Sequence, residues 1–218
     1  MKIKYLAHAS FLIVGVDGTT ILTDPYESGS YNGAIAYKPI TDKPDIIVVS
    51  HDHSDHNATH TISGNPLIIK TSAQAKGISF ETFSTYHDEA KGNKRGKNNI
   101  VLFSLDDIKL CHAGDLGHPL TAAQAEMIGD VDILFLPVGG YFTIDGSDAD
   151  KVVEILNPKI VIPMHYKTPG IGFPIAPVES FIGGKNNVER PGYSILSFEK
   201  PDLPENTKII VLEPELLP

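Results

Sequence analysis

The stretch Asp45-Ile46-Ile47-Val48-Val49-Ser50-His51-Asp52-His53-Ser54-Asp55-His56 joins a short apolar run to a dense group of polar side chains. The run is β-branched and almost continuously apolar, which is typical of a buried strand in the interior of a sheet. Three imidazoles and two carboxylates follow it within six residues. Such groups are costly to bury unless something binds them, and a divalent cation is the simplest partner. The sequence therefore predicts a metal site at the end of this strand.

The spacing within the cluster suits more than one ion. His51 and His53 are two residues apart, so an extended or tightly turned segment can bring both imidazoles onto one cation. Asp55 and His56 follow in the next turn and point elsewhere, which suits a second cation nearby. One zinc site takes about four ligands, of which three come from the protein if the site is catalytic. Two sites therefore need donors from other parts of the chain.

Further donors are expected at the ends of strands, because rigid elements hold ligand geometry best. Three residues meet this expectation, each directly after an apolar run: His87, Asp115 and His165. We therefore predict two sites that share Asp115, whose carboxylate can give one oxygen to each ion. The first site holds His51, His53 and His87, and the second holds Asp55, His56 and His165. A water or hydroxide held between the two ions is then the nucleophile.

Other histidines leave alternatives open. His112 also stands at a strand end and could replace His87, although it lies close behind Asp115 on the same strand. A hydrogen bond to a ligand is the natural alternative role for His112. His8 and His118 could carry a proton to the leaving group or could be structural.

Polar and aromatic segments outside the cluster could shape the site. Asp24 is expected to support the metal loop through hydrogen bonds. The basic, glycine-rich segment 91–98 could recognise an anionic substrate, but a solvated hairpin tip is the simpler interpretation. Aromatic residues in the loops could wall a pocket or simply pack: Tyr31, Tyr37, Tyr141, Phe142 and Phe173.

The order of the apolar runs indicates an α+β fold. Strands alternate with helices only in places, so two mixed sheets packed together, with helices outside, fit better than a doubly wound sheet. Strands are predicted at 2–6, 10–16, 20–23, 45–50, 66–70, 78–83, 99–105, 108–112, 132–137, 159–163, 194–198 and 208–212. Helices are predicted at 57–62, at 120–128 with Thr121 as N-cap, and at 148–156 with Ser147 as N-cap.

Length and composition narrow the class of protein. A chain of 218 residues is long enough for one sizeable core, so we expect a single domain over residues 1–218. The net charge of −9 without a long basic block argues against nucleic-acid binding. The single cysteine, the absence of a signal-peptide core and the absence of a long apolar run predict a cytoplasmic protein without a membrane span. Composition predicts no oligomeric state.

Four motifs in order, HDHSDH at 51–56, His87, AGDLGH at 113–118 and IPMHY at 162–166, resemble the metallo-β-lactamase superfamily. The match is closest to the branch related to ascorbate-6-phosphate lactonase and N-acyl-phosphatidylethanolamine phospholipase D. The segments AHASF at 7–11, LTDP at 22–25 and LPVGG at 136–140 are also similar to that branch. The resemblance implies a four-layer αβ/βα sandwich with a dinuclear site at one edge, and it carries ligand roles onto the seven residues above. Asp115 resembles the bridging aspartate of phosphodiesterase and lactonase members, so hydrolysis of β-lactam antibiotics is not expected.

The function expected from these features is hydrolysis at a dinuclear centre. The substrate would be a small ester, lactone or phosphodiester, with an anionic one among the options, and Asp55 and Asp115 would be the catalytic carboxylates. Two divalent ions are expected, zinc first because of the imidazole-rich ligands, with manganese or iron as alternatives. A non-hydrolytic di-iron protein with oxygen or redox chemistry is the alternative function.

Overall fold

The computed structural model describes residues 1–218, and its first layer is a six-stranded mixed sheet. Its strand order is β13-β1-β2-β3-β4-β5. The strands are β1 (Lys2–Ala7), β2 (Ser10–Val14), β3 (Thr20–Thr23), β4 (Ile46–Val48), β5 (Leu67–Ile69) and β13 (Ile195–Ser197). Two antiparallel hairpins connect β1 to β3, and β3, β4 and β5 then run parallel.

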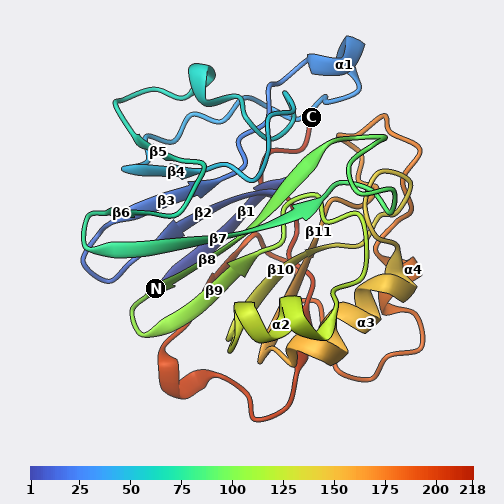
Figure 1. The fold of residues 1–218 in the computed structure, drawn as a ribbon. Coiled ribbons are helices and arrows are strands. Elements are labelled where there is room, and N and C mark those ends of the chain that lie inside the picture. The colour runs from blue at the N-terminus through green and yellow to red at the C-terminus, as the bar shows by residue number, and fades with distance from the viewer.

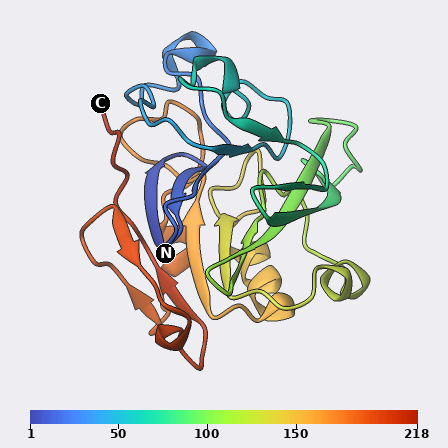
Figure 2. The same ribbon diagram turned by 90° about the vertical axis from the view of Figure 1, so that its left-hand side faces the viewer.

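The second layer is an eight-stranded mixed sheet with the order β12-β14-β11-β10-β9-β8-β7-β6. Its strands are β6 (Ala73–Ala75), β7 (Ile78–Tyr86), β8 (Lys97–Leu105), β9 (Ile108–His112), β10 (Ile133–Pro137), β11 (Ile160–Met164), β12 (Val188–Glu189) and β14 (Lys208–Ile210). The half from β9 to β12 is parallel, and β6 to β9 form antiparallel pairs. Figures 1 and 2 show the two sheets packed face to face.

The main core lies between the sheets. Phe11 of β2 packs on Phe135 of β10 with ring centroids 4.4 Å apart, so the two layers contact each other directly. Alternate residues of the small sheet, such as Ile3 and Ile13, enter this core. The neighbours of those residues, such as Leu12 and Leu22, enter a second apolar cluster on the outer face. This alternation is what a sheet with both faces covered requires.

The two outer faces are covered differently. Helices α2 (Ala122–Ile128), α3 (Gly146–Leu156) and α4 (Glu179–Ile182) lie over the large sheet (Figure 1). The small sheet is covered mainly by loops, whose buried residues include Tyr26, Tyr37 and Ile175. These loops contain only the single turn α1 (Ser30–Gly33) and the 3-10 turn η1 (Thr59–Thr61). The predicted α+β sandwich of two mixed sheets is confirmed, with one helical layer and one layer of loops.

The N-termini of α2 and α3 can be compared with the two predicted N-caps, Thr121 and Ser147. The Thr121 hydroxyl accepts a hydrogen bond from the Gln124 backbone N–H at 3.3 Å, as predicted. The prediction of Ser147 as the second cap is wrong, because α3 begins at Gly146 and the Asp145 carboxylate accepts the Asp148 N–H at 2.9 Å. An ionised carboxylate two residues earlier satisfies the free N–H groups of the first turn, which also favour negative charge.

Three other element predictions need revision. The segment 57–62 forms only the turn η1 rather than a helix. Strand β7 continues past residue 83, because its pairing with β8 extends to Tyr86 opposite Lys97. The strands β6 and β12 were not predicted; each is short, with two or three residues. A further η2 turn spans Lys200–Asp202. None of the helices has the length and hydropathy that crossing a membrane requires.

Candidate metal centre

The polar cluster is assembled where parallel strands end. In the small sheet β1, β3 and β4 run in one direction, so the residues that follow them meet at one edge. In the large sheet β7, β9 and β11 share a direction in the same way. These six strand ends supply the following residues: His8, Asp24, His51 to His56, His87, Asp115 and His165. The expectation that donors follow strands holds for every candidate.

The first predicted group comes together as expected. One ligand atom each from His51, His53 and His87 lies within 4.8 Å of the others. His51 Nε2 is 3.0 Å from His53 Nδ1, which is hydrogen-bonding distance. His51 and His87 are buried, whereas His53 is half-buried and faces the exterior of the group. The three rings therefore form a compact set that one cation could occupy.

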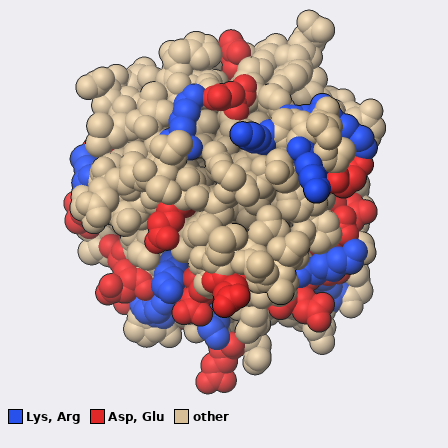
Figure 3. All heavy atoms as spheres, viewed as in Figure 1, with Lys and Arg blue, Asp and Glu red and all other residues tan.

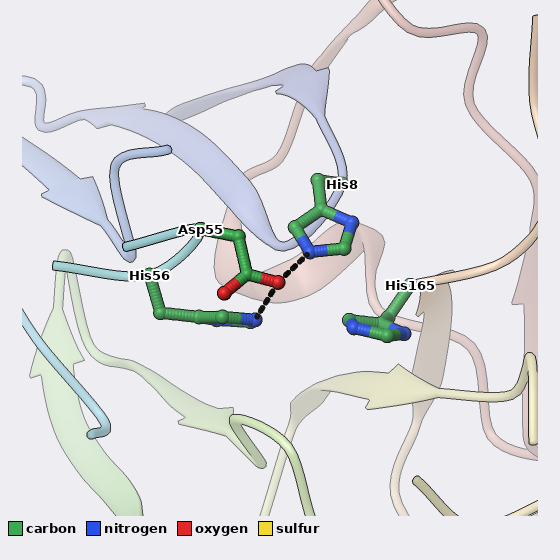
Figure 4. A group of neighbouring side chains, drawn as sticks. All are labelled: His8, Asp55, His56 and His165. Carbon is green, nitrogen blue, oxygen red and sulfur yellow. Dashed lines mark hydrogen bonds and ion pairs between the residues drawn. The ribbon is translucent and has the colours of Figure 1, made fainter. Parts of the chain in front are cut away.

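The second predicted group also comes together, with one addition. Asp55, His56 and His165 lie within the same 4.8 Å limit, and His8 joins them (Figure 4). His8 Nε2 is 3.1 Å from Asp55 Oδ2, and the ring centroids of His8 and His165 are 4.2 Å apart. Tyr31 donates its hydroxyl proton to the other carboxylate oxygen of Asp55 at 3.0 Å. All four residues of the group are buried.

Asp115 stands between the two groups. Its Oδ2 lies 3.1 Å from His87 Nε2, 3.2 Å from His56 Nε2 and 3.4 Å from His165 Nε2. Its backbone N–H donates to the Asn98 side-chain oxygen at 2.9 Å, which fixes the loop after β9. One carboxylate oxygen thus faces imidazoles from both groups, whereas the prediction gave one oxygen to each ion, and Oδ1 has no hydrogen-bond partner. The ligand role itself stays a prediction.

Burial favours the uncharged form of three imidazoles of the cluster, those of His8, His51 and His53. Burial lowers the pKa of His51 to about 3, with the nearby His56 acting in the same direction. Burial likewise lowers the pKa of His8 to about 4, with His165 acting in the same direction. The pKa of His53 is lowered by burial and by His87. Neutral imidazoles keep the lone pairs that a metal ion requires.

The carboxylates of the cluster are held in their charged form. Burial opposes the ionisation of Asp115, but the histidines around it, led by His165 and His56, hold its pKa well below the usual range. Burial also opposes the ionisation of Asp55, but the effects of His56 and His8 are larger, so the pKa of Asp55 is lowered as well. In return Asp115 and Asp55 raise the pKa of His56 against the effect of burial. Ionised carboxylates are the state that metal binding needs, whereas His56 would have to give up its proton to bind a metal ion.

Several buried polar atoms in the cluster have no hydrogen-bond partner. They are His8 Nδ1, His56 Nε2, His87 Nδ1, Asp115 Oδ1 and His165 Nδ1. A buried polar atom without a partner is expensive, and buried charges are normally paired or bound to metal. Imidazole nitrogens and carboxylate oxygens are also the ligand types that zinc prefers. The residues present therefore fit bound divalent cations.

Two further histidines of the motifs, His112 and His118, are hydrogen-bonded to the backbone. His112 donates from Nε2 to the Ala9 carbonyl at 3.0 Å and accepts the Gly114 N–H at Nδ1. Both of its nitrogens are thus used, and His87 rather than His112 joins His51 and His53. His118 Nδ1 donates to the Pro119 carbonyl at 2.9 Å, which indicates a structural role.

Asp24 supports the metal loop as predicted. It is fully buried, and its carboxylate accepts the Ser50 N–H at 2.7 Å and the Ser50 hydroxyl at 2.6 Å. The same carboxylate binds His56 Nδ1 at 2.9 Å. That contact orients the His56 ring so that Nε2 faces Asp115. Hydrogen bonds of this kind commonly orient imidazole ligands.

Two glycines allow the loops to approach each other. A Cβ atom at Gly117 would lie 2.2 Å from the His87 carbonyl carbon, and one at Gly139 would lie 2.2 Å from the His165 carbonyl oxygen. No other residue fits either place without moving a donor. These contacts explain the glycines in AGDLGH and LPVGG, which the motifs alone did not explain.

An open cavity of about 220 Å³ lies beside the cluster. Its polar lining comes from both groups and from Asp115, and its apolar lining comes from three aromatic residues: Tyr31, Phe142 and Phe173. Of the other two predicted wall residues, Tyr37 is buried beneath the loops and Tyr141 is exposed against Phe142. Ligand pockets for drug-sized molecules usually measure roughly 300–1,000 Å³, so this one suits a smaller molecule.

Known proteins are similar to this chain in sequence and in structure. Residues 2–165 match the family described as "Beta-lactamase superfamily domain". A metal-dependent hydrolase from Thermococcus onnurineus is 30% identical, covering 86% of this chain and 95% of the relative. One from Pyrococcus furiosus is 31% identical, covering 89% and 99%. The crystal structure of a proposed Zn-dependent hydrolase of the metallo-β-lactamase superfamily from Thermotoga maritima superimposes with a TM-score of 0.80 at 36% identity, covering 97% of this chain and 98% of that one. The chain therefore belongs to the metallo-β-lactamase superfamily and, within it, to the family of metal-dependent hydrolases that these relatives represent.

Proposed function

We propose that this protein is a hydrolase that cleaves a small ester, lactone or phosphodiester at a centre of two divalent cations. One observation carries the proposal: Asp115 Oδ2 lies within 3.4 Å of imidazole nitrogens from both predicted groups. A buried carboxylate needs positive charge nearby, and a cation in each group would supply it from both sides. The names of the relatives support the hydrolytic class.

The proposed ligands follow the two groups. His51, His53 and His87 would hold one cation, and Asp55, His56 and His165 would hold the other, with Asp115 shared between them. The two cations supply positive charge that polarises the substrate oxygen and lowers the pKa of a water molecule. Zinc fits the imidazole-rich set best, and manganese or iron are the alternatives, because mixed nitrogen and oxygen ligands discriminate weakly between these metals.

The chain's own residues would position the reactants. Asp55 and Asp115 remain ionised, so both can accept a hydrogen bond from the attacking water and orient it. Tyr31 donates to Asp55 and restricts the rotation of that carboxylate. A substrate bound against the aromatic side of the cavity would displace water from this space, which would strengthen electrostatic interactions there.

The proposal is tested with the variant Asp115→Ala and the matched control Asp130→Ala, whose carboxylate is 96% exposed on the surface. We expect about two metal ions per wild-type chain and hydrolysis of members of a panel of lactones and phosphodiesters. Asp115→Ala should bind less metal and lose at least ~100-fold in turnover, because both groups of histidines would lose the carboxylate that they share. A metal-replete, fully active Asp115→Ala would refute the proposal. Bound iron with visible absorption and no hydrolysis would instead favour the di-iron alternative.

A further inference from the structure

The rim of the cavity carries a cation that the chain does not neutralise. Arg95 is half-buried and forms no salt bridge with any carboxylate of the chain, although the protein has a net charge of −9. Two basic neighbours are paired, Lys94 with Glu89 and Lys70 with Asp52, whereas Lys91 and Lys97 of the same loop also lack a carboxylate partner but are exposed. In the view of Figure 3, basic side chains gather at the upper right, where Figure 1 places the end of the β7–β8 hairpin.

Arg95 lies against the wall of the cavity. Its guanidinium carbon is 5.4 Å from the centre of the Phe142 ring, which is within cation–π range. Phe142 lines the cavity beside His53, His87 and Asp115. Arg95 also lines an adjacent polar hollow of about 400 Å³, to which His53 belongs as well. The guanidinium therefore stands at the boundary between solvent and the candidate centre.

The loop that carries Arg95 is held rigidly. The Asp88 side chain is buried, and its two oxygens accept four backbone N–H groups, from Ala90, Gly92, Lys94 and Arg95, at 2.7 to 3.0 Å. Asp88 directly follows His87, whose own N–H donates to the Gly96 carbonyl at 3.1 Å. The position of Arg95 is thus tied to that of His87. A solvated hairpin tip, the simpler interpretation of this segment, would not need such an anchor.

We propose that Arg95 determines specificity by binding an anionic group of the substrate, so that the natural substrate is a small anionic ester with an apolar part. This inference rests on the proposed function and adds a substrate class to it. The carboxylate or phosphate-type anion would sit on the guanidinium, which offers a planar set of donors for such oxygens. The apolar part would lie against Phe142, Phe173 and Tyr31, with the scissile bond toward Asp115.

Neutral and anionic probes of similar size separate this role from a structural one. The full-length, metal-loaded protein is assayed with 4-nitrophenyl hemisuccinate and with the neutral 4-nitrophenyl butyrate. For Arg95→Gln we expect kcat/KM for the hemisuccinate to fall by about tenfold or more, mainly through KM, because a charge-assisted hydrogen bond is lost. The butyrate value should change by less than about twofold. Arg95→Lys should recover part of the loss, since it keeps the charge but not the planar donors.

Lys91→Gln is the matched control, because Lys91 is an exposed, basic residue of the same loop that lines neither the cavity nor the polar hollow. This variant should keep kcat/KM for both substrates within about twofold of the wild-type value. An equal fall in kcat/KM for both substrates in Arg95→Gln would mean that Arg95 only holds Phe142 in place. An unchanged kcat/KM for both would mean that Arg95 binds no anion. Either result overturns the inference. The ester 4-nitrophenyl 3-phosphonopropionate, assayed in parallel, carries a phosphate-type anion at the same distance from the scissile bond as the hemisuccinate carboxylate, and the size of its Arg95 dependence distinguishes the two kinds of anion.

A binding measurement keeps the inference independent of turnover. Calorimetric titration with succinate, the acid released from the hemisuccinate, should give a Kd about tenfold or more weaker in Arg95→Gln than in wild type or Lys91→Gln. If no ester is hydrolysed but succinate binding depends on Arg95, the proposed hydrolysis fails and the anion site stands. If the esters are hydrolysed but neither binding nor turnover depends on Arg95, the hydrolase stands and the anion site fails.

Discussion

Asp24 Oδ2 lies 2.9 Å from His56 Nδ1, and both side chains are fully buried. This contact fixes the ring of His56 so that Nε2 points to Asp115 Oδ2, 3.2 Å away. The residue after β3 therefore sets the orientation of a donor in the loop after β4. Asp24 itself adopts a positive φ of 35°, a strained conformation for a residue other than glycine. Strain of this kind persists only where the surrounding contacts over-determine it.

Replacing Asp24 by Asn should weaken metal binding without removing a proposed ligand. The amide would keep an oxygen for Ser50 but would turn an N–H group toward His56 Nδ1, so the imidazole would lose its acceptor. Loss of such a supporting hydrogen bond typically costs about 10–100-fold in metal affinity. Competition titration with a chromophoric chelator measures the zinc Kd, and urea unfolding checks that the variant is folded. A folded Asp24→Asn with wild-type zinc affinity would contradict the orienting role.

A pH effect is expected far from the cluster, at Asp45. Its hydrogen bond with Lys76, together with the N–H and hydroxyl of Thr20 at 2.9 Å, lowers the pKa of this carboxyl to about 2. Because the folded pKa lies below the unfolded value of 3.8, the stabilisation is present above pH 3.8 and is lost as the pH falls toward 2. The contact joins the loop before β4 to the β6–β7 turn.

Asp45→Asn should accordingly lower the free energy of unfolding by about 1 kcal/mol or less at pH 7, since the pair is partly exposed and screened. The difference from wild type should shrink toward zero near pH 2. Urea unfolding of both proteins in chelator, so that bound metal does not contribute, provides the comparison at each pH. Lys76→Gln removes the largest cause of the shift and should show the same trend. A difference that stays constant from pH 7 to pH 2 would exclude the proposed linkage.

The candidate donors were predictable because their signals are local. Apolar runs mark where strands end, and His51, His87, Asp115 and His165 each stand just past such a run. Because these strands run in the same direction, the residues that follow them lie at one edge. The position of a residue directly after a strand in the sequence therefore predicts which side chains come together. Thr121 was predictable for a similar reason, since its capping pattern lies within four residues.

Features that depend on contacts between residues far apart in the sequence were harder to predict. The place of His8 beside Asp55 depends on the parallel direction of β1 and β4, which two intervening strands determine. The choice of His87 over His112 depends on the Ala9 carbonyl, 103 residues away in sequence from the His112 ring that it binds. Asp145 displaced Ser147 as the cap because both residue types can cap and the preceding backbone decides between them. The loops that replace a helical layer over the small sheet carry no periodic pattern to read.

Adding a methyl group at Gly117 should impair the first group of donors without altering any of them. The Cβ of Gly117→Ala would lie 2.2 Å from both the His87 carbonyl carbon and the Asp88 nitrogen, so the backbone that carries His87 must move. A shift of about 1 Å in a catalytic group can cost on the order of 100-fold in rate, and we expect a loss of that order together with weaker zinc binding. Gly183→Ala is the control, because it adds a methyl group next to α4 with only a 3.0 Å contact to the Glu179 carbonyl. Both variants are compared by zinc titration, ester hydrolysis and urea unfolding. If Gly117→Ala were folded and kept wild-type zinc affinity and turnover, His87 could not be a ligand held in place by this close approach.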